Sequence, residues 1–89
     1  WLDWAQVLLQ MQEYDMGIKS LSQGIEFHPE NSQLHYMLAG FYMMQAKASE
    51  ASFFLKNAYS INPKDLDVFY ETFPTSKTAH LVKDTLSQS

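Results

Sequence analysis

Two stretches of the chain decide its fold: residues 24–38 read GIEFHPENSQLHYML, and residues 58–72 read AYSINPKDLDVFYET. In each stretch a proline follows an apolar segment and precedes polar residues that can cap a helix. Proline ends a helix because it lacks the N–H donor and its ring clashes with the preceding turn. Pro29 and Pro63 are 34 residues apart, so each is predicted to mark the joint between one helical unit and the next.

Polar residues after each proline are predicted to begin the following helix. Asn31 and Ser32 follow the first proline and Asp65 follows the second. Such side chains accept hydrogen bonds from the free N–H groups of a first helical turn. Inside each unit, polar residues interrupt the apolar pattern near positions 12–15 and 45–49, which predicts two helices per unit, joined by a tight turn without glycine.

Apolar and small residues repeat with the same 34-residue period, large on large and small on small. A repeat of this length with helical spacing inside each unit is typical of stacked helical hairpins. Small residues are expected where helices approach to about 8–10 Å. They are Ala5, Gly17 and Gly24 in the first unit and Ala39, Ala51 and Ala58 in the second.

These positions resemble the tetratricopeptide (TPR) repeat, whose pattern is W-x2-L-G-x2-Y, then A-x3-F, then P. The second unit resembles it through His35, Leu38, Ala39, Tyr42, Ala51, Leu55 and Pro63. The first unit resembles it through Trp1, Trp4, Ala5, Leu8, Gly17, Leu21 and Pro29. The resemblance implies an all-α fold, a right-handed superhelical stack of antiparallel hairpins. It divides one domain into a repeat over 1–30, a repeat over 31–64, and a degenerate repeat with a closing helix over 65–89.

The last part of the chain departs from the repeat. Pro74 falls inside the expected first helix of a third unit. A more polar closing helix is predicted after it, capped by Thr75 or Ser76. Its thin apolar stripe comprises Ala79, Val82 and Leu86.

Composition excludes several classes of function. The chain has 89 residues, a net charge of −4, six lysines, no arginine and no cysteine, so nucleic-acid binding, disulfides and thiolate sites are not expected. No apolar run approaches the roughly 18 residues of a membrane span, which predicts a soluble segment. The compartment stays open, the cytoplasm being slightly favoured. Because Trp1 already belongs to the apolar pattern, we expect the chain to be part of a longer protein.

The histidines and the clustered acidic residues are better explained by structural roles than by metal binding or catalysis. The histidines His28, His35 and His80 have no mutual spacing of three or four residues, as a helical metal site would require. Asp67 and Glu71 share a helix face, but acids in a first helical turn usually complement the helix dipole. We therefore expect no enzyme activity, no cofactor and no metal.

In TPR arrays the first helix of each hairpin lines a concave groove, and the resemblance implies a partner-binding groove here. The corresponding residues are Leu2, Gln6, Leu9, Gln10, Gln33, Tyr36, Gly40, Met43, Met44, Asp67 and Tyr70. Methionine and tyrosine suit such a surface. The alternative is that several of them pack against an adjoining repeat or the closing helix. No lysine or arginine stands where TPR domains that hold a chaperone's terminal carboxylate carry one, so an apolar or amphipathic segment, with a basic residue near Asp67 and Glu71, fits better.

The sequence thus favours a non-catalytic protein-interaction module that binds a peptide or helix of another protein, whose identity is open. The alternative is a structural end-cap of a longer TPR array, or self-association as a homodimer. Fewer than three full repeats are seldom stable alone, which is why self-association stays open.

Overall fold

The computed structural model of the chain describes residues 2–87, and for Leu2 its backbone alone. These residues form helices and no strand, so the all-α prediction is confirmed. The elements are α1 (Leu2–Gln10), α2 (Tyr14–Phe27), α3 (Ser32–Met44), α4 (Ala48–Ile61), the 3-10 turn η1 (Pro63–Asp65), α5 (Leu66–Thr72) and α6 (Ser76–Ser87).

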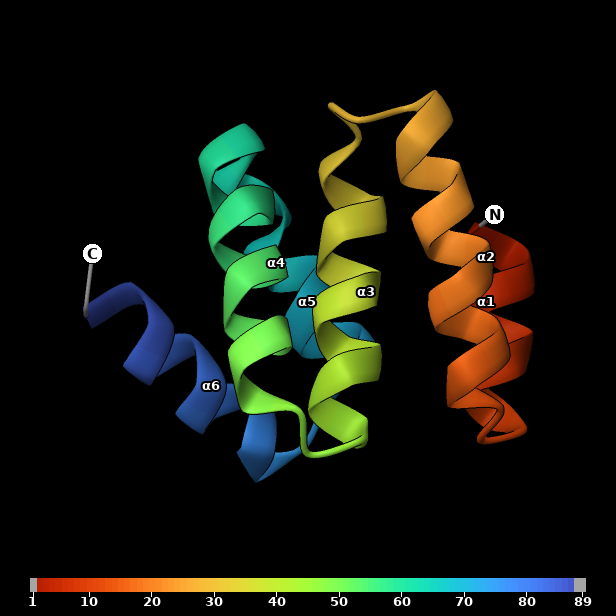
Figure 1. Cartoon of the computed structure of the whole chain (residues 1–89). Helices are drawn as coiled ribbons and strands as arrows, with labels where there is room; N and C mark the ends of the chain where they lie inside the picture. Colours follow the sequence, from red (N-terminus) through yellow and green to blue (C-terminus); the bar gives the residue numbers. More distant parts are fainter. Residues whose placement is uncertain (1, 88–89) are drawn as a thin grey trace.

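The helices form two antiparallel hairpins, α1–α2 and α3–α4, followed by a C-terminal segment (Figure 1). The hairpins pack together through α2 and α3, and α1 also contacts α3. In Figure 1, α2, α3 and α4 stand in front, while α1 lies behind α2 and α5 lies behind α3. The closing helix α6 packs on α4. One end of the stack is therefore α1, and the other end is covered by α6.

The backbone repeats with the period of the sequence. The turns within the hairpins fall at the two predicted interruptions, and each contains a non-glycine residue in the left-handed conformation, Gln12 with φ 60° and Ala46 with φ 59°. The hydrogen bonds around these residues form the same Schellman-type helix end. In the first turn, Gln12 N–H donates to the carbonyl of Leu9 and Glu13 N–H to that of Leu8. In the second, Ala46 N–H donates to the carbonyl of Met43 and Lys47 N–H to that of Tyr42. The 34-residue interval between the prolines is thus an interval between equivalent backbone positions.

The two joints between units differ in how the next helix is capped. Asn31 caps α3, as predicted, because its side chain accepts from two N–H groups of the first turn. The predicted cap at Ser32 is wrong, and Asp65, although it is the N-cap residue of α5, makes no side-chain cap hydrogen bond. Ser32 lies inside α3 and its Oγ donates to Asp65 Oδ2 at 2.5 Å, while Asn62 Nδ2 donates to the same oxygen at 3.2 Å. Asn62, directly before Pro63, caps the 3-10 turn η1, because its side chain accepts a hydrogen bond from Lys64 N–H.

The small residues that were predicted at helix contacts are all buried. Gly17 shows why size matters there. A Cβ at Gly17 would lie 1.8 Å from Cε2 of Phe41, so the aromatic ring of the second hairpin rests directly on the backbone of the first. Tyr14 packs edge-on against the same ring, with 6.1 Å between centroids. This contact fixes the spacing between α2 and α3.

The closing helix begins at Ser76, so Thr75, one of the two residues predicted to cap it, directly precedes it. Its buried face is not the predicted stripe. Val82 is buried and Leu86 is half-buried, whereas Ala79 is exposed. The buried face includes Thr78 and Thr85 instead. Both threonines read as polar in the sequence, which is why the prediction missed them.

Hydrogen bonds explain how two threonines are buried under α6. Thr78 Oγ1 donates to the carbonyl of Phe73 at 2.5 Å, and Thr85 Oγ1 donates to Ser52 Oγ on α4 at 3.1 Å. A buried hydroxyl with a partner avoids the cost of losing water. The methyl groups of these residues then serve as apolar contacts.

Candidate functional site

A hollow of about 80 Å³ lies between α1, α3 and α5. Its wall combines apolar and polar side chains from three helices and from η1. They are Gln6, Gln33, Tyr36, Met37, Asp65, Val68, Phe69, Thr72 and Phe73. Because the residues come from four separate elements, the hollow exists only when both hairpins and the C-terminal segment are assembled.

The floor of the hollow is aromatic and fixed in place. The ring centroids of Tyr36 and Phe69 are 5.8 Å apart, and those of Phe69 and Phe73 are 5.5 Å apart. Tyr36 Oη also donates to the carbonyl of Asn62 at 3.0 Å. Packed rings with a tethered hydroxyl lose few rotamers on binding, so this floor is preorganised.

A carboxylate stands at the edge of this floor. Asp65 is half-buried and is oriented by its hydrogen bonds from Ser32 and Asn62. Burial, and then the nearby charge of Asp65 and the hydroxyl of Tyr59, raise the pKa of Tyr36 to about 12. Tyr36 therefore remains a neutral hydrogen-bond donor at any physiological pH.

A second, shallower hollow continues the first along α1 and α5. It is lined by Gln6, Leu9, Gln10, Glu71 and Thr72. Gln6 and Thr72 belong to both hollows, so together the two make one continuous depression. We call it the α1/α3/α5 groove.

The groove contains five of the eleven residues that the sequence assigned to it: Gln6, Leu9, Gln10, Gln33 and Tyr36. Met44 is half-buried in the core, and Asp67 and Tyr70 are exposed without lining either hollow. The side chain of Leu2 lies outside the described residues. Gly40 and Met43 are buried and do not line the groove.

The burial of Gly40 has a specific cause. A Cβ at Gly40 would lie 2.1 Å from Cε2 and Cζ of Phe73, so the ring of Phe73 covers the glycine. Met43 lines a different hollow, beside Lys77 and His80 of α6. Met43 thus shares a hollow with the closing helix, whereas Gly40 is covered by Phe73, which lies before that helix.

The sequence assigned α5 to the groove through the wrong residues, Asp67 and Tyr70. Val68 and Thr72 line the hollow one helical turn apart, and so do Phe69 and Phe73. The apolar spacing of residues 68, 69 and 73 was visible in the sequence. The single short helix before Pro74 suffices to close the groove.

The three histidines lie in different surroundings. His28 follows α2 and His80 lies on α6, and both are exposed. His35 is buried, donates from Nε2 to the carbonyl of Pro29 at 2.9 Å, and has its Nδ1 buried without a hydrogen-bond partner among the described residues. Within residues 2–87, no three histidines or acidic residues are grouped so that they could hold a metal ion.

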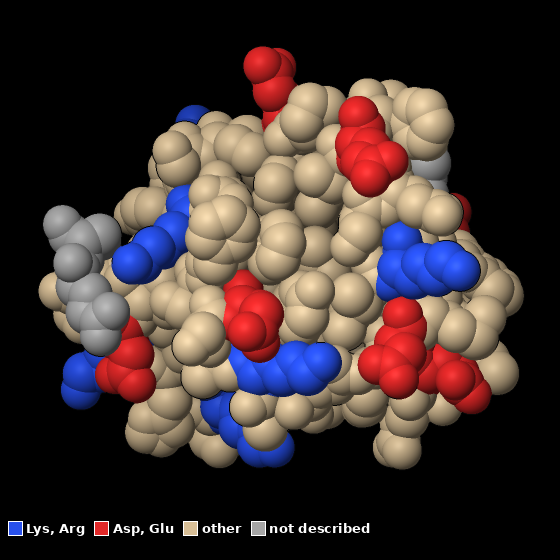
Figure 2. Space-filling view, in the orientation of Figure 1, with Lys and Arg blue, Asp and Glu red and all other residues tan. Residues whose placement is uncertain are grey.

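Charged side chains are mixed on the face that α2, α3 and α4 present (Figure 2). Lysines and acidic residues stand singly there, with uncharged surface between them. Of the helices in the described range, none has the length and apolarity needed to cross a membrane. Comparisons with models of known protein families, with curated proteins and with solved structures found no match for this chain. The groove is therefore interpreted from its own geometry and chemistry.

Proposed function

We propose that the chain is a TPR-like protein-interaction module that binds a peptide or helical segment of another protein in the α1/α3/α5 groove, without catalysing a reaction. The 34-residue repeat of sequence and of backbone hydrogen bonds supports the TPR-like part of the proposal. A right-handed superhelical stack of hairpins is the arrangement that this proposal implies.

The observation that carries the binding role is the preorganised hollow. It joins an apolar floor to two amide side chains, Gln6 and Gln33, and to the carboxylate of Asp65. Binding sites in proteins combine an apolar surface with a few convergent polar groups in this way. Apart from Phe73, the residues that line the hollow lie on α-helices or on the 3-10 turn η1, which suits recognition of a partner segment.

The test is selection of ligands from a phage-displayed library of random 12-residue peptides, followed by calorimetric titration of the selected peptides. Gln33 is exposed and lines the hollow, so Gln33→Trp should block it and weaken binding at least 10-fold. Gln23→Trp is the matched control, because Gln23 is exposed on α2 and lines neither hollow. Equal affinity of both variants and the wild type would contradict binding in the groove.

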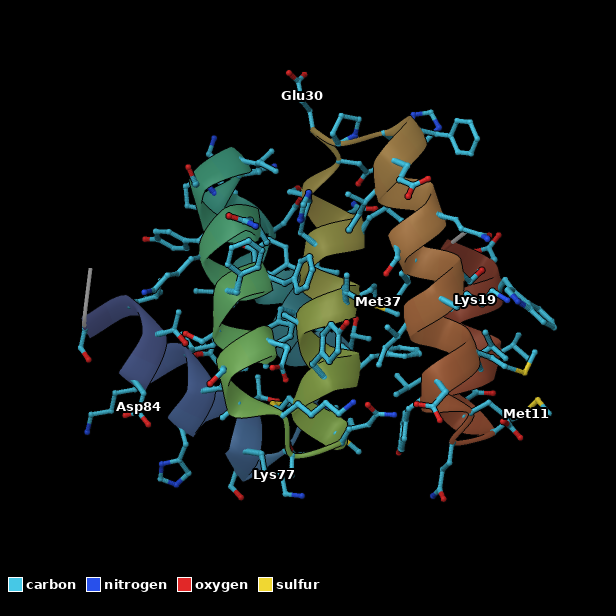
Figure 3. The ribbon with its side chains drawn as sticks, viewed as in Figure 1. Met11, Lys19, Glu30, Met37, Lys77 and Asp84 are labelled. Carbon is cyan, nitrogen blue, oxygen red and sulfur yellow. The ribbon has the colours of Figure 1, made fainter. Side chains whose placement is uncertain are left out.

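A second candidate role is structural, and the outer side of α1 favours it. Trp4 and Val7 on α1, and Met11 directly after it, are exposed at helical spacing, and Met11 projects away from the bundle in Figure 3. Contiguous exposed apolar surface often marks an interface. In this role α1 packs against another helical hairpin, as in the end-cap of a longer TPR array, or against a second copy of the chain.

Light scattering over a concentration series tests the self-association form of this role. A dimer that dissociates when Met11→Glu is introduced supports it, because a buried charge is costly in an apolar interface. A monomer at all concentrations leaves the outer side of α1 open to a different hairpin and leaves the groove proposal intact.

A further inference from the structure

Most of the net negative charge of the chain lies on the elements that border the groove. The elements that border it, α1, α3, η1 and α5, contain four of the ten acidic residues, Asp3, Asp65, Asp67 and Glu71, and one of the six lysines, Lys64. Three of the four net negative charges of the chain therefore lie on these elements. The rest of the chain is nearly neutral, in agreement with the mixed charges in Figure 2.

Two of these carboxylates line the groove itself. Asp65 lines the deeper hollow and Glu71 lines the shallower one. Both hydrogen bonds to Asp65, from Ser32 and Asn62, end on Oδ2. Its Oδ1 has no hydrogen bond within residues 2–87, so an oriented carboxylate oxygen remains available to a cation.

The size of the deeper hollow limits what can occupy it. Its volume of about 80 Å³ is roughly half that of an engineered apolar protein cavity of about 150 Å³ that holds benzene. An aliphatic side chain therefore fits better than an aromatic ring. The floor made by Tyr36, Phe69 and Phe73 offers apolar contact to such a side chain.

We infer that the groove takes a basic, amphipathic segment of a partner protein. One aliphatic side chain enters the deeper hollow, and lysine or arginine side chains pair with Asp65 and Glu71. This inference rests on the proposed function, because it names the chemical class of partner for the same groove. Complementary charge raises the association rate and excludes acidic competitors.

The probes are three fluorescein-labelled 12-residue peptides, LKKLLKKLLKKL, LQQLLQQLLQQL and LEELLEELLEEL, measured by fluorescence anisotropy against the whole chain. We expect the Leu–Lys peptide to bind at least 10-fold more tightly than the Leu–Gln peptide, and the Leu–Glu peptide to bind most weakly. Replacing the leucines of the first peptide by tryptophan should weaken binding, because of the size of the hollow.

Paired variants separate the groove from the overall charge. The double variant Asp65→Asn, Glu71→Gln should weaken binding of the Leu–Lys peptide about five-fold. The control Glu26→Gln, Glu50→Gln removes the same amount of charge from exposed positions on α2 and α4 and should change binding less than two-fold. Since Asp65 also holds Ser32 and Asn62, Glu71→Gln alone serves where the double variant unfolds, and a two- to three-fold loss is expected for it.

The outcomes distinguish this inference from the proposed function. Equal losses in the groove and control variants, or equal binding of the Leu–Lys and Leu–Gln peptides, would overturn the basic partner. If Gln33→Trp still blocks the Leu–Gln peptide in that case, the groove binds segments of other chemistry. If Gln33→Trp blocks none of the peptides, the groove itself is not the site, and both proposals fail.

Discussion

The outer sides of α1 and α3 occupy equivalent positions of the 34-residue repeat, yet one is exposed and the other is buried. Val7 is 43% exposed, whereas its counterpart Phe41 is 0% exposed. Trp4 is 51% exposed and its counterpart Leu38 is 0% exposed. The turns that follow the two helices have the same backbone conformation. The local structure of the two helices does not explain the difference. On this side α3 is covered by α2, where Phe41 lies against Gly17, and the equivalent side of α1 is exposed.

The exposed apolar side of α1 corresponds to the side of α3 that a neighbouring helix covers. On α3 the same position supplies Phe41, whose ring rests on Gly17 of the neighbouring hairpin. A repeat unit has two apolar sides, and each needs a neighbour. At the other end of the molecule, α6 provides that neighbour for α4. Within residues 2–87, α6 therefore covers α4 at one end of the molecule, while Trp4 and Val7 of α1 are exposed at the other.

Of the equivalent positions Phe41 and Val7, we expect substitution of Phe41 to have the largest effect on the free energy of unfolding. Phe41→Ala should lower the free energy of unfolding by about 3–5 kcal/mol, because it empties a fully buried position between the hairpins. Val7→Ala should change it by less than about 1 kcal/mol. Urea unfolding followed by circular dichroism measures both. Similar losses for the two variants would mean that the outer side of α1 is buried in solution.

A smaller effect is expected at Tyr36, which lies on α3 and faces the groove. Its pKa is raised to about 12 in the folded chain, above the ordinary value of about 10 for an unfolded tyrosine. Below pH 10 both states hold the proton, and between pH 10 and 12 only the unfolded state releases it, so folding stability falls as the pH rises. We expect a loss of about 1–2 kcal/mol, less than the full value of the shift because the residue borders an open hollow.

The variant Tyr36→Phe isolates this contribution from other groups that titrate at alkaline pH. It should cost about 1 kcal/mol at pH 7 by removing the hydrogen bond to Asn62. Its disadvantage should then shrink as the pH rises from 10 to 12. A difference between wild type and variant that stays constant over this range, in urea titrations at several pH values, would contradict the buried placement of Tyr36.

The two hairpin turns offer a prediction of matched, stabilising changes. Gln12 and Ala46 adopt left-handed backbone conformations, which cost a residue with a Cβ about 1–2 kcal/mol relative to glycine. Gln12→Gly and Ala46→Gly should therefore each raise the free energy of unfolding, by about 0.5–1 kcal/mol once the greater freedom of the unfolded chain is subtracted. A stabilisation at one turn and a loss at the other would break the equivalence of the hairpins.

The smallest effect on stability is expected at Trp4. Because its side chain is half-exposed on the unpaired side of α1, Trp4→Gln should change the free energy of unfolding by less than about 0.5 kcal/mol in a monomer. The melting temperature measured at low and high protein concentration checks this. A decrease that appears only at high concentration would show that Trp4 lies in an interface between copies.

Much of the fold could be predicted from the sequence, because it follows from local rules. The prolines, the asparagine cap at Asn31 and the helical spacing of apolar residues each act through neighbouring backbone. The buried small residues could be predicted for the same reason, since Gly17 and Ala51 recur at one place in each unit.

The site could be predicted only in part, because its remaining features depend on contacts between distant segments. Asp65 was expected to cap a helix, but its carboxylate binds Ser32, 33 residues away. Gly40 was expected to face a groove, but Phe73 folds over it. No local pattern gives the orientation of a short helix after a broken repeat, so Asp67 and Tyr70 were predicted to line the groove in place of Val68, Phe69 and Thr72.

Binding in the α1/α3/α5 groove can be located by a ¹⁵N nuclear magnetic resonance titration of the chain with the peptide LKKLLKKLLKKL. We expect the largest amide shifts in the groove, around Gln6, Gln33 and Thr72, and little change at Met11, which directly follows α1. Largest shifts around Met11, with the groove unchanged, would contradict the claim and would assign partner binding to the unpaired end of the repeat.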